Sequence, residues 1–470
     1  MIFQKILSNH VLHFQEIVGP DYVFMDSDSL QKYSHDETED LRFPPEIVIL
    51  PFNTEEVSSI LKFCNQENIC VTPRGAGTGL SGGALAVYGG VILSLERLNK
   101  IILIDERNYQ VTVEPGVITQ TLQDELKERN LFYPPDPASR GSCFIGGNIA
   151  ENSGGPKAVK YGVVKDYVLN LEVVLPDGEI IWTGANVLKN ATGYNLTQLV
   201  VGSEGTLCIV TKIILRLIPY PEYDLLMLVP FRSAIQACEA VNAVFLAGVT
   251  PSAIEFMERD AIDWAIQFID VKNLPVAEEI KAHLLIELDG NNLEQLYQDA
   301  EKISIAVSKY ETGDILFAET AQQKADLWKL RRGVAEAVKS HSIYKEEDTV
   351  VPRAELPVLL KGIKETGAKY GFQSVCYGHA GDGNLHVNII KGEMNEDQWT
   401  IKLPFAIREI FELCVQLGGT LSGEHGIGWV QKPYLDIAFN PVQIQLMKAI
   451  KKVFDPKGIL NPGKIFIEND

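Results

Sequence analysis

The sequence predicts an α+β protein with two large domains. Its 470 residues exceed the roughly 250 to 300 at which a single hydrophobic core stops growing. Between Pro45 and Pro221, short β-branched runs alternate with turns and short helical stretches, which is typical of an α+β domain. From Tyr223 onward, the strand-like runs are separated by longer helical patterns, so a second domain begins near residue 222.

Hydrophobic periodicity predicts the individual elements. In the first domain we expect an amphipathic helix at 1–19 and strands at 47–50, 69–72, 91–95, 111–114, 171–175 and 207–217. In the second domain we expect strands at 225–230 and 282–288, strand-like residues at 375–390, and helices at 234–247, 293–309 and 320–341. The chain should close with a helix at 441–454 and an extended stretch at 461–464.

Composition and charge exclude several classes of protein. The net charge of −20 disfavours nucleic acid and anionic membrane surfaces, which are bound mainly through clustered Lys and Arg. The longest apolar runs fall far short of the roughly 18 to 20 residues that a membrane-spanning helix needs. Residues 1–19 lack the unbroken apolar stretch of a signal peptide, so we expect a cytoplasmic protein without a transmembrane segment.

The same acidic charge and the cysteines set two further expectations. An acidic substrate would be repelled by the protein as a whole, so its site should contain Arg, Lys or a metal ion. The seven cysteines are scattered and never spaced as Cys-x-x-Cys. This predicts buried free thiols in a reducing compartment, and no iron–sulfur cluster or zinc ribbon held by this chain.

Two glycine-rich segments offer sites for phosphate groups. The first, 73–83, follows a predicted strand, and its glycines let backbone N–H groups turn toward an anion. Gly77, Gly79 and Gly82 match the spacing G-x-G-x-x-G. A Rossmann loop must open a helix, however, and 84–95 is predicted to be a turn followed by a strand. A glycine-rich hairpin without a ligand remains the alternative for this segment.

The second glycine-rich segment, 145–155, follows the proline-rich 133–137 and favours a long diphosphate ligand, because one domain then holds two phosphate-sized sites. Together with 202–207 and Asn461-Pro462-Gly463-Lys464, these segments resemble the vanillyl-alcohol-oxidase-type (PCMH-type) FAD-binding fold. The resemblance runs nearly end to end. It is closest to the flavin subunit of glycolate oxidase and to D-lactate and D-2-hydroxyglutarate dehydrogenases.

This resemblance implies both a domain order and an activity. An N-terminal helical segment, 1–42, should precede a two-subdomain FAD-binding domain at 43–222. An α+β substrate (cap) domain at 223–425 should carry a metal site, and a C-terminal helical segment, 426–470, should return to the flavin domain. The implied reaction is FAD-dependent oxidation of a small D-2-hydroxy acid, such as glycolate or D-lactate, by hydride transfer to flavin N5.

The resemblance also places the cofactor. The diphosphate should lie against Arg74, Gly75, Ala76, Gly77, Thr78, Gly79 and Ser81. The isoalloxazine and ADP parts should be flanked by Pro135, Asp136, Gly146, Gly147, Asn152, Ser153 and Gly205 to Val210, with Asn461 from the closing segment. Relatives that bind FAD covalently usually carry a histidine in or near the first loop, and this chain has none there, which implies non-covalent FAD. Cys208 departs from the glycine that relatives often have.

Residues 377–388 predict a different kind of site. Asp382-Gly383 is a strong two-residue hairpin turn, which would place His379 directly opposite His386. Directly opposed Cβ atoms lie roughly 4.5 to 5.5 Å apart, so the two imidazoles are close enough to ligate one ion. Asn388 shares their face because side chains alternate along a strand. A pair of solvated histidines remains the alternative.

A third histidine and an acid lie in a glycine-rich frame at 421–428. In the resembling dehydrogenases these motifs supply ligands of a divalent metal. Carried over, the ligands are His379, His386 and Glu424, and the catalytic base is His425. Three protein ligands leave coordination positions open, as in catalytic sites. Zinc is the first expectation, and manganese and iron tolerate the same ligands.

The substrate should meet an arginine. By resemblance Arg331 holds the substrate carboxylate through its bidentate fork, and Asn388 completes the catalytic set. Arg332 lies on a different helical face, where we expect solvent or a salt bridge. Enzymes specialised for D-2-hydroxyglutarate offer Thr where this chain has Ala335 and a lysine where it has Glu346, which favours a monocarboxylate. An alignment shifted by one residue would bring in Lys345 instead and favour D-2-hydroxyglutarate.

Reduced FAD must pass its electrons on, so we expect a separate acceptor: an iron–sulfur subunit, an electron-transfer flavoprotein, a quinone or a cytochrome. Any attachment to a membrane would run through that partner, and a homodimer remains open.

Two other functional classes also remain open for this chain. One is a metal-dependent hydrolase in which His379, His386 and Glu424 activate water, and the other is a non-catalytic nucleotide-binding subunit.

Overall fold

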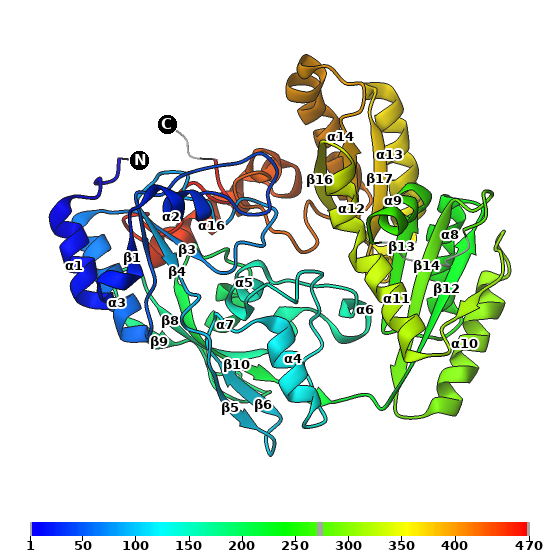
Figure 1. The fold of residues 1–470 in the computed structure, drawn as a ribbon, viewed down its shortest axis with the longest axis horizontal. Coiled ribbons are helices and arrows are strands. Elements are labelled where there is room, and N and C mark those ends of the chain that lie inside the picture. The colour runs from blue at the N-terminus through cyan, green and yellow to red at the C-terminus, as the bar shows by residue number, and fades with distance from the viewer. Residues whose placement is uncertain (1, 270–275, 468–470) are drawn as a thin grey trace.

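The computed structural model describes residues 2–269 and 276–467. Met1 and residues 468–470, which belong to the first and last predicted segments, lie outside this range. Figure 1 shows two bodies side by side, one holding both ends of the chain and the other built around a large sheet. No helix within the described ranges is long and apolar enough to cross a membrane. All seven cysteines are buried free thiols, as predicted.

The first body begins with a four-stranded sheet of order β1-β2-β4-β3, in which β2, β4 and β3 run parallel and β1 is an antiparallel edge. Helices α1 and α3 cover it through side chains such as Phe14 and Ile60. The elements are α1 (Ser8–Val18), β1 (Val23–Phe24), α2 (Ser27–Lys32), β2 (Ile47–Ile49), α3 (Thr54–Glu67), β3 (Val71–Arg74) and β4 (Val91–Ser94). Residues 84–90 are turns, so the first glycine segment does not open a helix, as predicted.

An antiparallel five-stranded sheet of order β5-β6-β10-β8-β9 completes the first body. Its strands are β5 (Ile101–Asp105), β6 (Gln110–Val113), β8 (Val168–Val174), β9 (Ile180–Trp182) and β10 (Ile209–Arg216). The remaining elements are α4 (Thr119–Lys127), α5 (Ile145–Glu151), α6 (Ala158–Tyr161), α7 (Leu196–Val200) and the strand pair β7 (Leu131–Phe132) and β11 (Ile218–Pro219). Helix α5 thus starts within the second glycine segment.

The second body is an antiparallel seven-stranded sheet of order β15-β12-β14-β13-β17-β18-β16. Its strands are β12 (Tyr223–Phe231), β13 (Ala253–Glu258), β14 (Ala282–Gly290), β15 (Leu316–Phe317), β16 (Tyr344–Val350), β17 (Gln373–Gly378) and β18 (Asn384–Ile390). One face packs on α8 (Ala234–Leu246), α10 (Leu293–Val307), α13 (Leu356–Tyr370) and α14 (Leu403–Gln416). The other packs on α9 (Arg259–Ile269), α11 (Ala321–Arg332) and α12 (Val334–His341).

The chain then returns to the first body through α15 (Leu435–Ala438) and α16 (Pro441–Phe454). The return is anchored where the N–H of Val71 donates to Ile459 O at 2.8 Å and the N–H of Asn461 donates to Val71 O at 2.7 Å.

Three element predictions were wrong in detail. The first helix occupies 8–18 and not 1–19, and the helix predicted at 320–341 divides at Gly333 into α11 and α12. The stretch 461–464 forms a turn and is not extended, since Asn461 has a φ of 42°. A left-handed residue redirects the chain, and asparagine tolerates that conformation better than most residues.

Candidate active site

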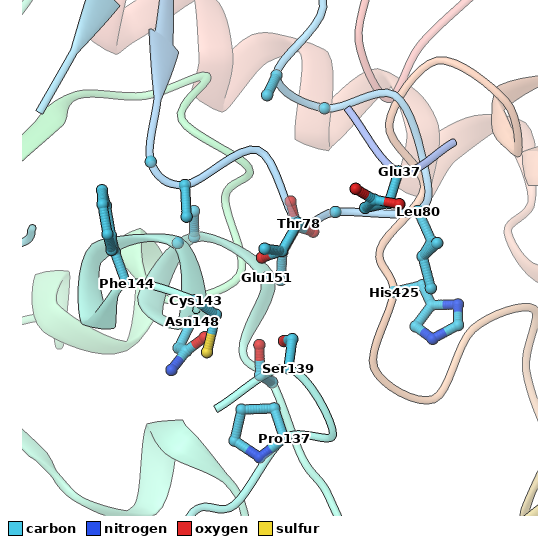
Figure 2. Close-up of a pocket in the computed structure, with 18 of the residues that line it drawn as sticks. Glu37, Thr78, Leu80, Pro137, Ser139, Cys143, Phe144, Asn148, Glu151 and His425 are labelled. Atoms are coloured by element: carbon cyan, nitrogen blue, oxygen red, sulfur yellow. The ribbon is translucent and has the colours of Figure 1, made fainter. Parts of the chain in front are cut away.

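A cavity of about 440 Å³ lies where the glycine-rich loops of the first body face the second. Figure 2 shows Thr78 and Leu80 of the first loop, Asn148 of α5, and His425 from the second body around this space. The predicted site residues that line it are Arg74, Gly75, Ala76, Gly77, Thr78, Gly79, Gly146, Gly147, Ser153, Gly205, Val210, Arg331, His379, His386, Glu424 and His425.

The two glycine loops leave room for a ligand. A Cβ built on Gly79 or Gly147 would meet no heavy atom within 4 Å among the described residues, so the cavity reaches the backbone there. Arg74 folds beneath the first loop, where its Nη2 donates to His35 O at 2.8 Å. Its Nη1 is buried without a hydrogen-bond partner in the part of the chain that the structure describes. A buried cation with an unused N–H next to open backbone fits a diphosphate.

The three predicted metal ligands converge at the other end of the cavity. Nε2 of His379 lies 3.1 Å from Oε1 of Glu424, and Nε2 of His386 lies 3.6 Å from the same oxygen. Ligand atoms on a tetrahedral zinc ion are separated by about 3.4 Å, given metal–ligand bonds near 2.1 Å. Although burial opposes it, the His379 imidazole lowers the pKa of Glu424 to about 2, so this ligand is charged. The cluster fits a divalent cation.

The hairpin that carries both histidines has a different register from the predicted one. Tyr377, and not His379, lies opposite His386, because β17 ends at Gly378. Residues 379–383 form a longer turn, in which the N–H of Gly381 donates to Ile254 O on the neighbouring strand β13. That hydrogen bond holds the turn against the sheet. His379 and His386 still meet, with ring centroids 5.4 Å apart.

The acid Asp348 on β16 organises the segment that supplies Glu424 and His425. One of its oxygens, Oδ2, accepts hydrogen bonds from the N–H of Glu424 at 2.7 Å, the N–H of His425 at 2.9 Å and the hydroxyl of Ser422 at 2.7 Å. Its other oxygen, Oδ1, lies 3.5 Å from Nδ1 of His386. One buried carboxylate therefore fixes the loop and faces a candidate ligand.

The candidate base and the candidate carboxylate-binding arginine flank this cluster. The His425 ring stacks on His386 with centroids 5.2 Å apart and planes 10° apart. Arg331 is buried, and its guanidinium lies over the ring of Tyr377. Asn388 is buried too, and within the described residues neither atom of its amide has a hydrogen-bond partner. Of these groups, His425 and Arg331 line the polar end of the cavity, and Asn388 does not.

Residues 45–184 match the family described as "FAD binding domain", and residues 220–465 match "FAD linked oxidases, C-terminal domain". The chain is 40% identical to "Glycolate oxidase subunit GlcD" of Bacillus subtilis (strain 168), over 97% of this chain and 96% of that protein. The chain belongs to the FAD-linked oxidase family. It is 37% identical to "D-lactate dehydrogenase" of Anaerostipes hadrus, over 98% of both chains, and 35% identical to "D-2-hydroxyglutarate dehydrogenase" of Stutzerimonas stutzeri (strain A1501), over 96% and 97%.

Solved structures place this FAD-linked oxidase in the predicted fold. p-Cresol methylhydroxylase aligns with a TM-score of 0.80 at 21% identity, over 98% of this chain and 97% of that one. 4-Ethylphenol oxidase from Gulosibacter chungangensis aligns with a TM-score of 0.80 at 20% identity, over 100% and 99%. The α+β, PCMH-type fold and the FAD-dependent oxidoreductase class are therefore confirmed.

Several residues that were predicted to touch FAD do not line the cavity in this oxidase. Two of them connect the segments around it. Asp136 accepts hydrogen bonds from Arg140 and from Arg332, each at 3.0 Å. The contact with Arg332 joins the two bodies. Asn461 donates to Glu204 O at 2.8 Å and ties the C-terminal segment to the flavin domain. The others outside the lining are Ser81, Pro135 and Asn152, together with Asn388 of the catalytic set.

The position that was expected to discriminate between substrates is occupied by an acid. Glu346 and Ala335 line the cavity, whereas Lys345 does not. The reason is the alternation of side chains along β16, which turns neighbouring residues to opposite faces of the sheet. Burial raises the pKa of Glu346 to about 7.

Sequence reasoning missed Glu255, Asp348 and Glu204. Glu204 accepts the backbone N–H groups of Ile427 at 2.8 Å and Gly428 at 2.6 Å, and so holds the His425 loop against the flavin domain. For Glu255 a signal was present, because a single acid interrupts the apolar strand 253–257. Charged residues are almost never fully buried unless they are paired. An acid within an apolar strand therefore indicates that a group paired with it lies nearby.

Proposed function

We propose that this FAD-linked oxidase converts a D-2-hydroxy monocarboxylate, with D-lactate and glycolate as the first candidates, to the 2-oxo acid. The observation that carries the proposal is that one cavity joins the flavin-binding loops to the cluster of His379, His386 and Glu424, with His425 and Arg331 beside it. The relatives named for glycolate, D-lactate and D-2-hydroxyglutarate support this substrate class.

The roles of the residues follow from their chemistry. A divalent ion held by the cluster would supply a Lewis acid for the substrate hydroxyl, and FAD would supply the hydride acceptor. Arg331 binds the carboxylate and fixes which face of the substrate meets the flavin loops. His425 accepts the hydroxyl proton, since histidine is the side chain most often used as a general base. Asn388 does not line the cavity, so we assign it no direct contact with the substrate.

We propose that FAD is bound non-covalently. No histidine occurs in the first glycine loop, 73–83. Cys208 lines the cavity, but burial raises the pKa of its thiol to about 12, so it stays protonated and a poor nucleophile. Acid-precipitated protein should therefore release its flavin into the supernatant.

The domain boundaries predicted from the sequence, 1–42, 43–222, 223–425 and 426–470, are also part of the proposal. They are supported by the break between β11, which ends at Pro219, and the seven-stranded sheet, which starts at Tyr223. We further propose a separate electron acceptor, because reduced flavin must be reoxidised and the seven cysteines are buried free thiols.

The substrate proposal predicts a selectivity that Glu346 sets. FAD reduction by D-lactate, L-lactate, glycolate and D-2-hydroxyglutarate is followed with an artificial acceptor. We expect a higher kcat/KM for D-lactate or glycolate than for the dicarboxylate, because Glu346 stands where a cation would be needed to bind a second carboxylate. Glu346→Lys should raise kcat/KM for D-2-hydroxyglutarate by at least about tenfold.

Lys345→Gln is the matched control, since Lys345 neighbours Glu346 in sequence but does not line the cavity. It should leave the selectivity unchanged. A wild-type preference for D-2-hydroxyglutarate over both monocarboxylates would contradict the proposed substrate.

A further inference from the structure

The acid Glu255 lies at the centre of the second body. Its neighbours Ile254 and Phe256 point into the apolar core beneath α8 and α13, so Glu255 points to the opposite face, toward the cavity. Its side chain has 0% exposure. A buried carboxylate is costly unless it is paired and hydrogen-bonded, so its partners explain why it is there.

The first partner is the candidate ligand His379. Nδ1 of His379 lies 2.9 Å from both carboxylate oxygens of Glu255, while Nε2 faces Glu424 at 3.1 Å. A histidine that donates its Nδ1–H to a carboxylate keeps the lone pair of Nε2 for a metal. Glu255 therefore sets both the tautomer and the ring orientation that the metal cluster requires.

The second partner is Arg331. Nη2 of Arg331 forms an ion pair with Oε2 of Glu255 at 2.7 Å, with its N–H bonds not aligned for a hydrogen bond. Nε and Nη2 of Arg331 have no hydrogen-bond partner within the described residues. The ion pair thus offsets the buried charge and anchors one side of the guanidinium, and N–H groups remain for a substrate carboxylate.

We propose that Glu255 is a positioning residue that couples the metal ligand His379 to the carboxylate-binding Arg331, so that metal and substrate carboxylate each bind more tightly when the other is present. The inference rests on the proposed function. One carboxylate shared by two sites makes the arrangement of each depend on the other, and such a coupling is reciprocal by thermodynamic necessity.

The test uses the FAD-loaded enzyme and Glu255→Gln, which keeps the shape of the side chain and removes its charge. Zinc affinity is measured by chelator competition, and propionate affinity by the change in the flavin spectrum, with and without zinc. We expect zinc to bind about 10- to 100-fold more weakly to the variant. We also expect zinc to tighten propionate binding in the wild type but not in the variant.

Glu258→Gln is the matched control. Glu258 lies on the same strand and is ion-paired with Lys364 at 2.7 Å, away from the cavity lining. It should leave zinc affinity and propionate affinity unchanged. If Glu255→Gln does not retain FAD, Glu255→Asp replaces it, because the shorter side chain keeps the charge but cannot reach both partners.

Wild-type zinc affinity in a folded Glu255 variant, or a zinc effect on propionate equal to that of the wild type, would overturn the inference. Failure of the proposed function has a different signature. In that case the wild type itself would bind zinc no more tightly than a His379→Ala variant.

Discussion

Gly77 and Gly147 both line the cavity, and each is a glycine for a different reason. Gly77 has a φ of +74°, and a Cβ there would overlap the guanidinium of Arg74, so any side chain strains the protein itself. Gly147 lies in α5, where a Cβ would meet no heavy atom within 4 Å among the described residues. Its backbone tolerates a side chain, and we propose that FAD occupies the space in front of it.

Gly147→Leu should therefore give a folded protein that has lost FAD. The measurements are the ratio of flavin to protein absorbance after purification and the melting temperature, which should match that of wild-type apoprotein. Gly77→Leu should lower both the flavin content and the stability of the apoprotein. A full complement of FAD in Gly147→Leu would show that the cofactor does not approach this loop.

Glu347 predicts a pH dependence of stability. It is buried on β16 and accepts a hydrogen bond from Gln431 at 2.7 Å. Burial raises its pKa to about 8. A carboxyl whose pKa is higher in the folded state loses stabilising effect as the pH rises from its ordinary pKa, about 4.3, through about 8, because the unfolded chain gives up the proton first.

Glu347→Gln should accordingly match the wild type in melting temperature near pH 4 and exceed it at pH 8. The exposed Glu365→Gln serves as the control, with no difference expected at either pH. A variant that melts below the wild type at pH 8 would show that the carboxylate is stabilised by partners and not penalised by burial.

At the scale of elements, the site is assembled on one face of the four adjacent strands β13-β17-β18-β16. Strand alternation puts Glu255 of β13, His386 of β18 and Asp348 of β16 on the face that looks toward α11 and α12. The flavin loops lie on other elements, after β3 and at the start of α5. Metal binding and flavin binding should therefore be separable.

Replacing His379 or Glu424 by alanine should abolish metal binding and activity together, and leave the flavin spectrum largely intact. Removal of the metal with a chelator should have the same effect on the wild type, and added zinc should restore its activity. Full turnover by protein shown to be free of metal would refute the Lewis-acid role.

At the scale of the whole molecule, the cavity exists only while the two bodies stay together. Lys157 of the flavin domain is paired with Glu287 and lies 3.5 Å from Asp289, both on β14 of the second body. Lys160 adds a second ion pair with Asp289 at 2.6 Å. These partly buried pairs hold the bodies close to the site, together with the contact between Asp136 and Arg332.

Lys157→Met should destabilise the protein by up to about 3 kcal/mol, since it leaves Glu287 short of its cation while Lys160 still neutralises Asp289. Calorimetry should show a lower unfolding midpoint, and KM should rise because the cavity is less well closed. Lys165→Met, an exposed change in the same segment, should stay within about 0.5 kcal/mol of the wild type. Equal midpoints for the two variants would exclude this role for Lys157.

The sequence by itself determined the α+β class and the two glycine loops, and its resemblance to known dehydrogenases pointed to His379, His386 and Glu424. Periodicity, turn chemistry and motif spacing are local properties, so they can be recognised in the sequence without knowing how the chain packs. It also predicted helix 441–454 with the bounds that the structure has.

Only the tertiary structure decided the register of the histidine hairpin, the choice of Glu346 over Lys345 at the cavity, and the role of Glu255. The hairpin turn is fixed by a hydrogen bond to Ile254, which belongs to another strand. Glu255 reaches His379 across 124 positions of sequence. Such contacts depend on the strand order β13-β17-β18-β16, and that order is set by how the whole sheet packs between its two layers of helices, which no local pattern encodes.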